Sequence, residues 1–509
     1  MKPVKRIIVN TVAQYTKSII NIGFSLYSTR LILDALSVND YGIYVLVFGI
    51  TGILGYLTNT FIVTTQRYLS FYIGKGDYDY VKKLFGNSLL IHIVLGVSFV
   101  LLLVLFEDLL INHYLDIEPN RRPAAGVVYY LMAGMLFFSI VSSPFKALLV
   151  THENIVYISI VEIVDGILKL LLALCLVIVH TDKLIAYSIG MAIILVANFL
   201  AFAIYVLICY PESRVGLLGW KQRDKECVCQ LLSFAGWTTY SMVASICQTQ
   251  GTSIVLNKFF GTAMNAAYGV GMQVNSAVRF VSTSVLNAMN PQLMKAEGKG
   301  DREKMLLLAG KESKFSTALM MIVAIPLMVE MDSILSFWLK TVPEHTSLFC
   351  NGLLIAFLVD QLTLGLHAAN QATGKIMKYT IIMSTPKILY IPFSVIALSL
   401  GAAVDSVMII YIVIELVVAL YRIPFMKHLV NLDMRKYVND VLLPLLPLGI
   451  VVTSASLLLS RYVNMQYGFL VVVFIGMILG VCAMWAFCLS KDERQYVVNF
   501  IKRRQKEWE

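Results

Sequence analysis

Charged residues are scarce in this sequence. They make up 14% of the 509 residues, whereas a typical soluble domain contains about 25%. Hydrophobic residues reach 58%, and the mean hydropathy is +0.76. A chain this apolar is not a soluble protein, and its composition predicts an all-α polytopic membrane protein.

Metal and nucleotide motifs are also missing. The eight cysteines are scattered, and the one close pair, Cys227 and Cys229, has no second pair at a zinc-binding spacing. No Walker A phosphate loop occurs, so direct coupling to ATP is not expected. The net charge of +10 is spread between apolar segments instead of forming one basic domain. We therefore expect no metal, no cofactor and no nucleic-acid partner.

Fourteen apolar segments are long enough to cross a bilayer, which takes about 20 helical residues. The basic start, Met1 to Arg6, is not followed by a small-residue cleavage site, so we expect the first segment to be retained as a span. The segments are 8–34, 42–65, 85–106, 124–150, 155–179, 184–209, 231–257, 263–290, 314–338, 347–372, 379–400, 404–427, 441–460 and 467–489.

Lysine and arginine are unevenly divided between the two sides of these segments. An even number of spans places both termini on one side. The loops and helix ends of that side carry 31 basic residues, Lys146, Lys387 and Arg422 among them, and those of the other side carry six. Because basic residues are retained in the cytoplasm, we expect cytoplasmic N- and C-termini in a bacterial inner membrane.

The two halves of the sequence repeat each other. Gly74–Asp77 reads Gly-Lys-Gly-Asp and recurs as Gly298–Asp301, 224 residues later, and Tyr41-Gly42 recurs as Tyr268-Gly269. Each half holds six spans, which predicts two six-helix lobes related by a pseudo-two-fold axis along the membrane normal, plus two C-terminal helices. We expect an N-terminal lobe, a cytoplasmic linker, a C-terminal lobe, the added helices and a basic tail at 1–209, 210–230, 231–428, 429–489 and 490–509.

Polar residues form narrow stripes at helical spacing on several spans. They are Asn10, Gln14, Lys17 and Asn21 on the first span, Gln248 on the seventh, and Arg279, Thr283 and Asn287 on the eighth. Such stripes either line a water-filled cavity or bond neighbouring helices to each other. Their continuity over several turns favours a central cavity that binds substrate.

Charged residues inside spans indicate function, because an unpaired charge costs at least about 2.5–3.5 kcal/mol at mid-membrane. Lys17 and Arg279 lie on the polar stripes, so we expect them in the cavity. Glu162 and Asp165 share a helical face with Lys169, where Asp165 and Lys169 can form a local pair or the three can form a ligand site.

Two further carboxylates, Asp360 and Glu415, lie mid-segment without a basic residue nearby on the same segment. They are either paired across helices or bind a proton or Na⁺. Prolines are expected to break several spans, with Pro386 and Pro392 interrupting the segment 379–400.

Several runs of this sequence resemble those of a known family. They are Arg30 to Tyr44, Thr64 to Ser70, the Gly-Lys-Gly-Asp loop, Ala266 to Asn275 and Met289 to Lys295. They resemble bacterial polysaccharide-unit flippases of the multidrug/oligosaccharidyl-lipid/polysaccharide exporter superfamily, and the resemblance covers residues 5–430. It implies two lobes that open alternately to each side of the membrane.

The substrate that the resemblance implies is an undecaprenyl-diphosphate-linked oligosaccharide. It would be moved from the cytoplasmic to the periplasmic leaflet for O-antigen, capsule or exopolysaccharide synthesis, by a secondary transporter and not by an enzyme. Lys17 and Arg279 would receive the diphosphate, and H⁺ or Na⁺ would couple through the carboxylates Asp360, Glu415, Glu162 or Asp165. Membrane lipids and a polysaccharide polymerase or glycosyltransferases would be partners.

Mid-membrane carboxylates also suit an alternative. A cation-coupled multidrug or small-molecule exporter of the same fold would use them to bind its coupling ion.

Overall fold

The computed structural model describes residues 3–114, 117–214, 225–339, 342–463, 465, 467–491 and 493–495. Within these ranges every regular element is a helix, which confirms the all-α class. Parts of the predicted linker and tail, residues 215–224 and 496–509, lie outside the described residues.

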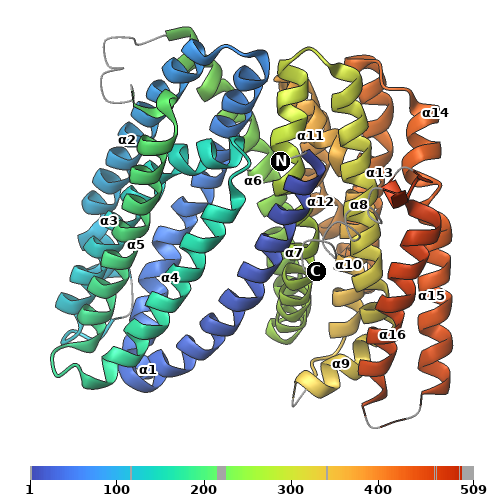
Figure 1. Cartoon of the computed structure of the whole chain (residues 1–509). Coiled ribbons are helices and arrows are strands. Elements are labelled where there is room, and N and C mark those ends of the chain that lie inside the picture. The colour runs from blue at the N-terminus through green and yellow to red at the C-terminus, as the bar shows by residue number, and fades with distance from the viewer. Residues whose placement is uncertain are drawn as a thin grey trace, which may run out of the picture. The chain divides into compact units, whose positions relative to one another are not determined.

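The longest element is α1, Pro3–Lys75, whose 73 residues cover the first two predicted spans. A straight helix of that length would measure about 110 Å, more than three times the hydrocarbon thickness of a bilayer. Figure 1 shows that the ribbon of α1 runs in one direction, turns near its middle and returns. The hydropathy pattern predicts a break between the segments 8–34 and 42–65. In the structure the first two spans are instead joined by a bend within one helical element.

The chain forms two compact units. Unit 1 comprises Met1–Thr239 with Met294–Gly300, and unit 2 comprises Tyr240–Leu293 with Asp301–Glu509. The division falls inside α6, Lys225–Phe260, and α7, Thr262–Gly298, so each of these helices contributes residues to both units. The lobe boundaries expected from the sequence stay a prediction.

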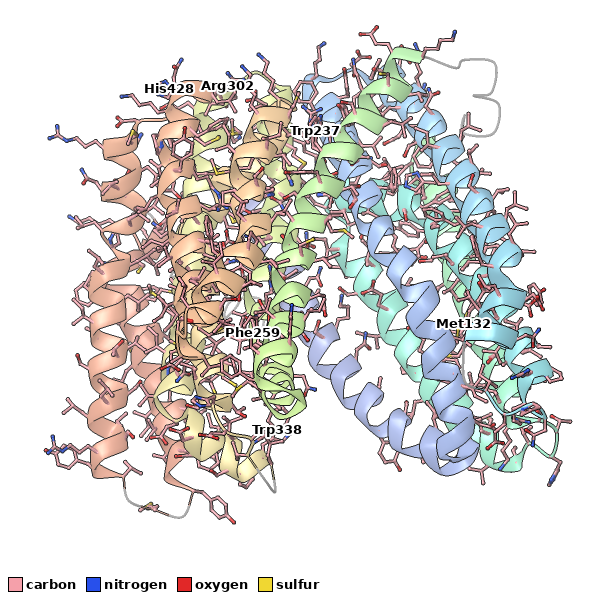
Figure 2. The ribbon with its side chains drawn as sticks, turned by 180° about the vertical axis from the view of Figure 1, so that it is seen from behind. Met132, Trp237, Phe259, Arg302, Trp338 and His428 are labelled. Atoms are coloured by element: carbon pink, nitrogen blue, oxygen red, sulfur yellow. The ribbon has the colours of Figure 1, made fainter. Side chains whose placement is uncertain are left out.

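Unit 1 is built from α1 and four further long helices. Leu36 and Val47 of α1 pack with Val128, Tyr129 and Met132 of α3 in its buried core, where Met132 is labelled in Figure 2. The elements after α1 are α2 (Tyr78–Asp108), η1 (Leu109–Tyr114), α3 (Arg122–Thr151), α4 (Ile155–Cys175), η2 (Leu176–Ile178), α5 (Lys183–Cys209) and η3 (Pro211–Ser213).

Unit 2 holds the remaining helices. Those after α7 are α8 (Arg302–Val329), α9 (Met331–Trp338), α10 (Thr346–Gln361), α11 (Leu364–Thr373), α12 (Met377–Ser399), α13 (Asp405–Val430), α14 (Met434–Tyr437), η5 (Val438–Leu442), α15 (Leu445–Tyr462), α16 (Gly468–Ala483) and η6 (Met484–Cys488). The added C-terminal helices pack on α8, where Gly476 lies against Pro326 and Gly480 against Ile322.

Labelled residues mark the two ends of unit 2. Figure 2 shows Arg302, at the start of α8, and His428, near the end of α13, at one end of the unit, and Trp338, at the end of α9, at the other. The end with Arg302 and His428 is the one predicted to be cytoplasmic.

The helices follow the predicted spans closely. Each of the fourteen segments falls on one helix or on a consecutive pair. Eight described helices are long and apolar enough to cross a membrane, or nine when α10 and α11 count as one bent span. Among those that fall short are α1, α4, α6 and α7, which carry the polar stripes and internal charges. The chain is an all-α polytopic membrane protein.

The prediction that prolines break the spans is wrong for α12. Pro386 and Pro392 lie inside one continuous helix. The bent span is the pair α10 and α11, where the axis turns by 48° between Gln361 and Leu364, and this break contains no proline. A proline is tolerated in a membrane helix because neighbouring groups satisfy the freed carbonyl.

The repeated Gly-Lys-Gly-Asp motif forms the same turn in both halves. Gly76 and Gly300 have φ of 81° and 76°, which is the left-handed region that glycine adopts without steric cost. The carboxylates of Asp77 and Asp301 then accept hydrogen bonds from the amides three residues later, each at 3.1 Å, and cap α2 and α8. The motif is therefore a helix stop, a glycine turn and a helix start.

Candidate functional site

In unit 1, Glu162 on α4 lies between two lysines. Its Oε2 is 2.6 Å from Lys17 Nζ on α1, and its Oε1 is 3.9 Å from Lys146 Nζ on α3. Lys17 retains 16% of its side-chain surface and Lys146 retains 35%. Lys146 also lies 4.9 Å from the centre of the Phe202 ring on α5. The charge alternation along the sequence places Lys146 with the cytoplasmic loops, because it lies near the end of its segment, and so gives it no part in this site.

The next charged residues along α4 are also paired. Asp165 Oδ2 is 2.8 Å from Lys169 Nζ, and Asn198 Nδ2 on α5 donates to Asp165 Oδ1 at 2.6 Å. Of the two alternatives that the sequence left open for these residues, the structure shows the local pair between Asp165 and Lys169. We call these five charged residues, Lys17, Lys146, Glu162, Asp165 and Lys169, the N-terminal cluster. It contains three cations and two carboxylates.

The polar stripe of α1 contacts the first half of α4 and the turn before it. Asn10, which is 2% exposed, donates to the backbone oxygen of Glu153 at 2.9 Å, and Asn21 donates to that of Glu162 at 3.2 Å. Gln14 lies on the same stripe and is buried. For Asn10 and Asn21 the structure thus supports the alternative of bonds between helices, and Lys17 joins them through its ion pair.

In unit 2, two carboxylates are paired across helices. Asp360 Oδ1, at the end of α10, is 3.0 Å from Arg422 Nη2 on α13. The guanidinium also donates to Thr363 Oγ1 at 3.0 Å. Glu415 on α13 accepts from Lys387 Nζ on α12 at 2.8 and 3.0 Å. Of the two arrangements that the sequence left open for these carboxylates, the structure shows pairing.

The basic partners correct the assignment of charges to loops. Lys387 and Arg422 were counted with the cytoplasmic loops, but both lie within helices, and Arg422 is 4% exposed. A buried cation persists there because a carboxylate on a neighbouring helix compensates it. Two features of the sequence could have indicated this: Lys387 is central in its apolar segment, and Glu415 and Arg422 are spaced by two helical turns.

Arg279 on α7 lies beside these pairs. Its guanidinium carbon is 4.7 Å from the centre of the Phe357 ring, the residue is exposed, and its charge acts on Asp360. We call Arg279, Asp360, Lys387, Glu415 and Arg422 the C-terminal cluster. Like its counterpart, it contains three cations and two carboxylates.

The other stripe residues of α6 and α7 differ in exposure. Gln248 is 1% exposed, and its Nε2 has no hydrogen-bond partner among the described groups. Thr283 is exposed and donates to the Arg279 backbone oxygen at 3.1 Å, and Asn287 is half-buried. In the described part of the chain, no three His, Cys, Asp or Glu side chains converge as metal ligands.

Comparisons with known proteins agree on the fold. The family described as "Polysaccharide biosynthesis protein" matches residues 4–296. No curated protein matches the sequence significantly. Three similar solved structures align with this chain over nearly their whole length.

A multidrug resistance MATE family transporter of the MOP superfamily, in an outward-facing conformation, aligns with a TM-score of 0.71 at 13% identity over 85% of this chain and 96% of its own. A MOP superfamily transporter from Pyrococcus furiosus aligns with a TM-score of 0.70 at 14% identity, over 86% and 97%. A MATE structure in the straight conformation gives 0.72 at 13% identity, over 86% and 98%. The chain therefore has the fold of MOP-superfamily transporters.

Proposed function

Because the chain belongs to the polysaccharide biosynthesis protein family, we propose that it is a flippase for undecaprenyl-diphosphate-linked oligosaccharides. It moves them from the cytoplasmic to the periplasmic leaflet of a bacterial inner membrane by alternating access, for the synthesis of a surface polysaccharide. A diphosphate and its sugars cannot cross hydrocarbon, whereas the isoprenoid tail can remain in the lipid. Only the head group therefore needs a polar, basic path through the protein.

The observation that carries this proposal is the excess of positive charge in both clusters. Each cluster has one more cation than carboxylates. Three of the cluster cations are accessible, since Lys146 and Lys169 keep 35% and 42% of their side-chain surface and Arg279 is exposed. Lys169 is paired with Asp165 at 2.8 Å, so Lys146 and Arg279 are the better candidates for binding an anion. Ammonium and guanidinium groups bind phosphate oxygens strongly, arginine in a two-pronged geometry. An anionic head group suits such sites better than a cationic drug does.

Coupling to H⁺ or Na⁺ remains part of the proposal, but its site is constrained. The carboxylates of Glu162, Asp165, Asp360 and Glu415 all form ion pairs with the chain's own lysines or arginines. A coupling ion would have to displace one of those side chains. These carboxylates are thus poorer candidates in this conformation than their positions in the sequence indicate.

A complementation experiment tests the proposal. Lys146→Ala and Arg279→Ala, each produced in a host that lacks its own polysaccharide flippase, should reduce surface polysaccharide, and Lys17→Ala should do the same by freeing Glu162 to neutralise Lys146. Lys304→Ala is the matched control, because Lys304 is exposed at the first turn of α8. Normal polysaccharide from all three cluster variants at equal membrane abundance would contradict the proposal. If the same variants instead lost resistance to cationic drugs, the exporter alternative would replace it.

A further inference from the structure

Glu312 on α8 is a buried carboxylate that no other group in the described part of the chain compensates. Its exposure is 0%, and neither carboxylate oxygen has a hydrogen-bond partner among the described residues. No ion pair with a described lysine, arginine or histidine involves it. The four carboxylates of the two clusters, by contrast, are all paired.

Three hydroxyl groups near Glu312 are already engaged. Ser313 Oγ accepts the amide of Gly365 on α11 at 2.9 Å. Ser316 Oγ donates to the backbone oxygen of Glu312 itself at 2.7 Å. The Tyr437 hydroxyl on α14, the titratable group on which Glu312 acts electrostatically, donates to the Leu362 backbone oxygen at 2.9 Å. The carboxylate therefore lies beside hydroxyl groups that do not bond to it.

The titratable groups on the elements packed against α8 are also committed or exposed. On α11, His367 bonds Tyr379 and Gln371; on α10, Asp360 pairs with Arg422; and on η6, Cys488 donates to the Pro444 oxygen. Cys350 of α10 is buried among apolar residues. The exposed groups on these elements are Asp332, Asp440, Arg461, Tyr462 and Cys482.

On α8 itself, Lys311 and Lys314 both contact Glu493, at 2.9 and 3.2 Å. The remaining charged residues at its start, Arg302, Glu303 and Lys304, are exposed. No described charge is therefore available to the Glu312 carboxylate in this conformation.

Burying an ionised carboxylate in such a place is energetically unfavourable. Its desolvation costs several kcal/mol when no cation or donor compensates it, whereas a neutral acid loses only the hydrogen bonds that its hydroxyl and carbonyl would make in water. We propose that Glu312 is a proton-binding site, holding its proton in this conformation and releasing it when a rearrangement of α8 admits water or a cation. As a coupling site this inference rests on the proposed transport function; as a proton site it does not.

Infrared spectroscopy of the purified full-length protein tests the proton directly. At neutral pH, the carbonyl band of a protonated carboxylic acid should be present in the unmodified protein and absent in Glu312→Gln. Glutamine has nearly the shape of the neutral acid, so this variant should fold. Glu303→Gln, an exposed glutamate of the same helix, should keep the band. A band that persists in Glu312→Gln, or is absent from the unmodified protein, would overturn the assignment.

Transport in vesicles tests the coupling. With a pH gradient imposed, Glu312→Gln should move lipid-linked oligosaccharide no faster than the unmodified protein moves it without a gradient, while Glu303→Gln should respond fully. An unchanged response of Glu312→Gln would reduce the residue to a structural acid. If the unmodified protein moved no lipid-linked oligosaccharide, the proposed function would fail while the infrared result still decided the proton site.

Discussion

Gly74 lies against the backbone of Lys295. A Cβ atom on Gly74 would come within 2.2 Å of the Lys295 carbonyl oxygen, and one on Gly298 would come even closer to that of Phe71. Gly74 and Gly298 are equivalent positions of the repeat, and so are Phe71 and Lys295 at the same offset of 224. The ends of α1 and α7 therefore cross in unit 1 with local two-fold symmetry.

This crossing predicts that both glycines are needed for packing. Gly74→Ala and Gly298→Ala should each destabilise the protein by about 1–3 kcal/mol, because a backbone carbonyl cannot move aside as a flexible side chain can. Thermal unfolding in detergent measures the loss. Gly134→Ala is the control, since an added Cβ there meets nothing within 4 Å and should be neutral or slightly stabilising. Equal melting temperatures for all three variants would contradict the crossing.

The pair between Lys387 and Glu415 should behave as a buried unit. Glu415→Gln leaves Lys387 without its partner and should cost about 3–5 kcal/mol of stability. The double variant Lys387→Met with Glu415→Gln should recover most of that loss, because no charge is left unpaired. Chemical unfolding of the two single variants and the double variant gives the coupling energy. Additive losses would show that the two side chains do not interact.

Arg121 joins three elements of unit 1 and should not tolerate lysine. Its Nε and Nη2 donate to both oxygens of Asp40 at 2.9 and 2.7 Å, and its Nη1 donates to Asp182 at 2.7 Å. Lysine cannot reproduce this fork, so Arg121→Lys should lower stability by about 1–3 kcal/mol in melting experiments. Arg122→Lys is the matched control, because Arg122 bonds a single backbone oxygen, that of Ile117. A larger loss for Arg122→Lys would refute this explanation.

Glu493 should make the attachment of the segment after α16 pH-dependent. Burial alone would raise the pKa of Glu493, but the Ser490 amide and the cations Lys311 and Lys314 lower it to about 2, from 4.5. Because the folded pKa is depressed, the stabilisation is complete above pH 4.5 and is lost as the pH falls through about 2.

Protease protection of this segment, followed from neutral pH down to about 3, should therefore weaken at the acid end of the range. In Glu493→Gln the protection should be low and nearly independent of pH. In Asp440→Asn, a change at an exposed residue of η5, protease protection should depend on pH as it does in the unmodified protein. Identical profiles for Glu493→Gln and the unmodified protein would remove Glu493 from the attachment.

Local features of the sequence predicted much of the fold. The fourteen apolar segments marked the helices, because a helix needs about 20 consecutive, mainly apolar residues to cross a bilayer and such a run is visible in the sequence. The Gly-Lys-Gly-Asp turn was recognisable as a repeat, and its geometry follows from two local requirements, a positive φ and a helix cap. The pair Asp165–Lys169 was one of the two arrangements that helical spacing allowed.

The candidate site was only partly predictable. The polar stripe on α1 was visible in the sequence. Its spacing did not show, however, that Asn10 and Asn21 donate hydrogen bonds to backbone oxygens in and just before α4 instead of facing water. Lys146 and Arg422 were assigned to the cytoplasmic loops because charge alternation treats a basic residue near a segment end as a loop residue, although both are paired with carboxylates of other helices. Nothing in the sequence distinguishes Glu312, since a glutamate close to two lysines is typical of a solvated helix face.

By itself the sequence determined the class of protein, the helices, the repeat and the turns, because these depend on neighbours along the chain and on the bilayer as a solvent. Only the tertiary structure decided which carboxylate each buried cation pairs with and which carboxylate is left alone. Such partners come from helices as far apart in sequence as Lys17 and Glu162. At that separation the folded packing sets the distance, and with it the Coulomb energy and the cost of desolvation.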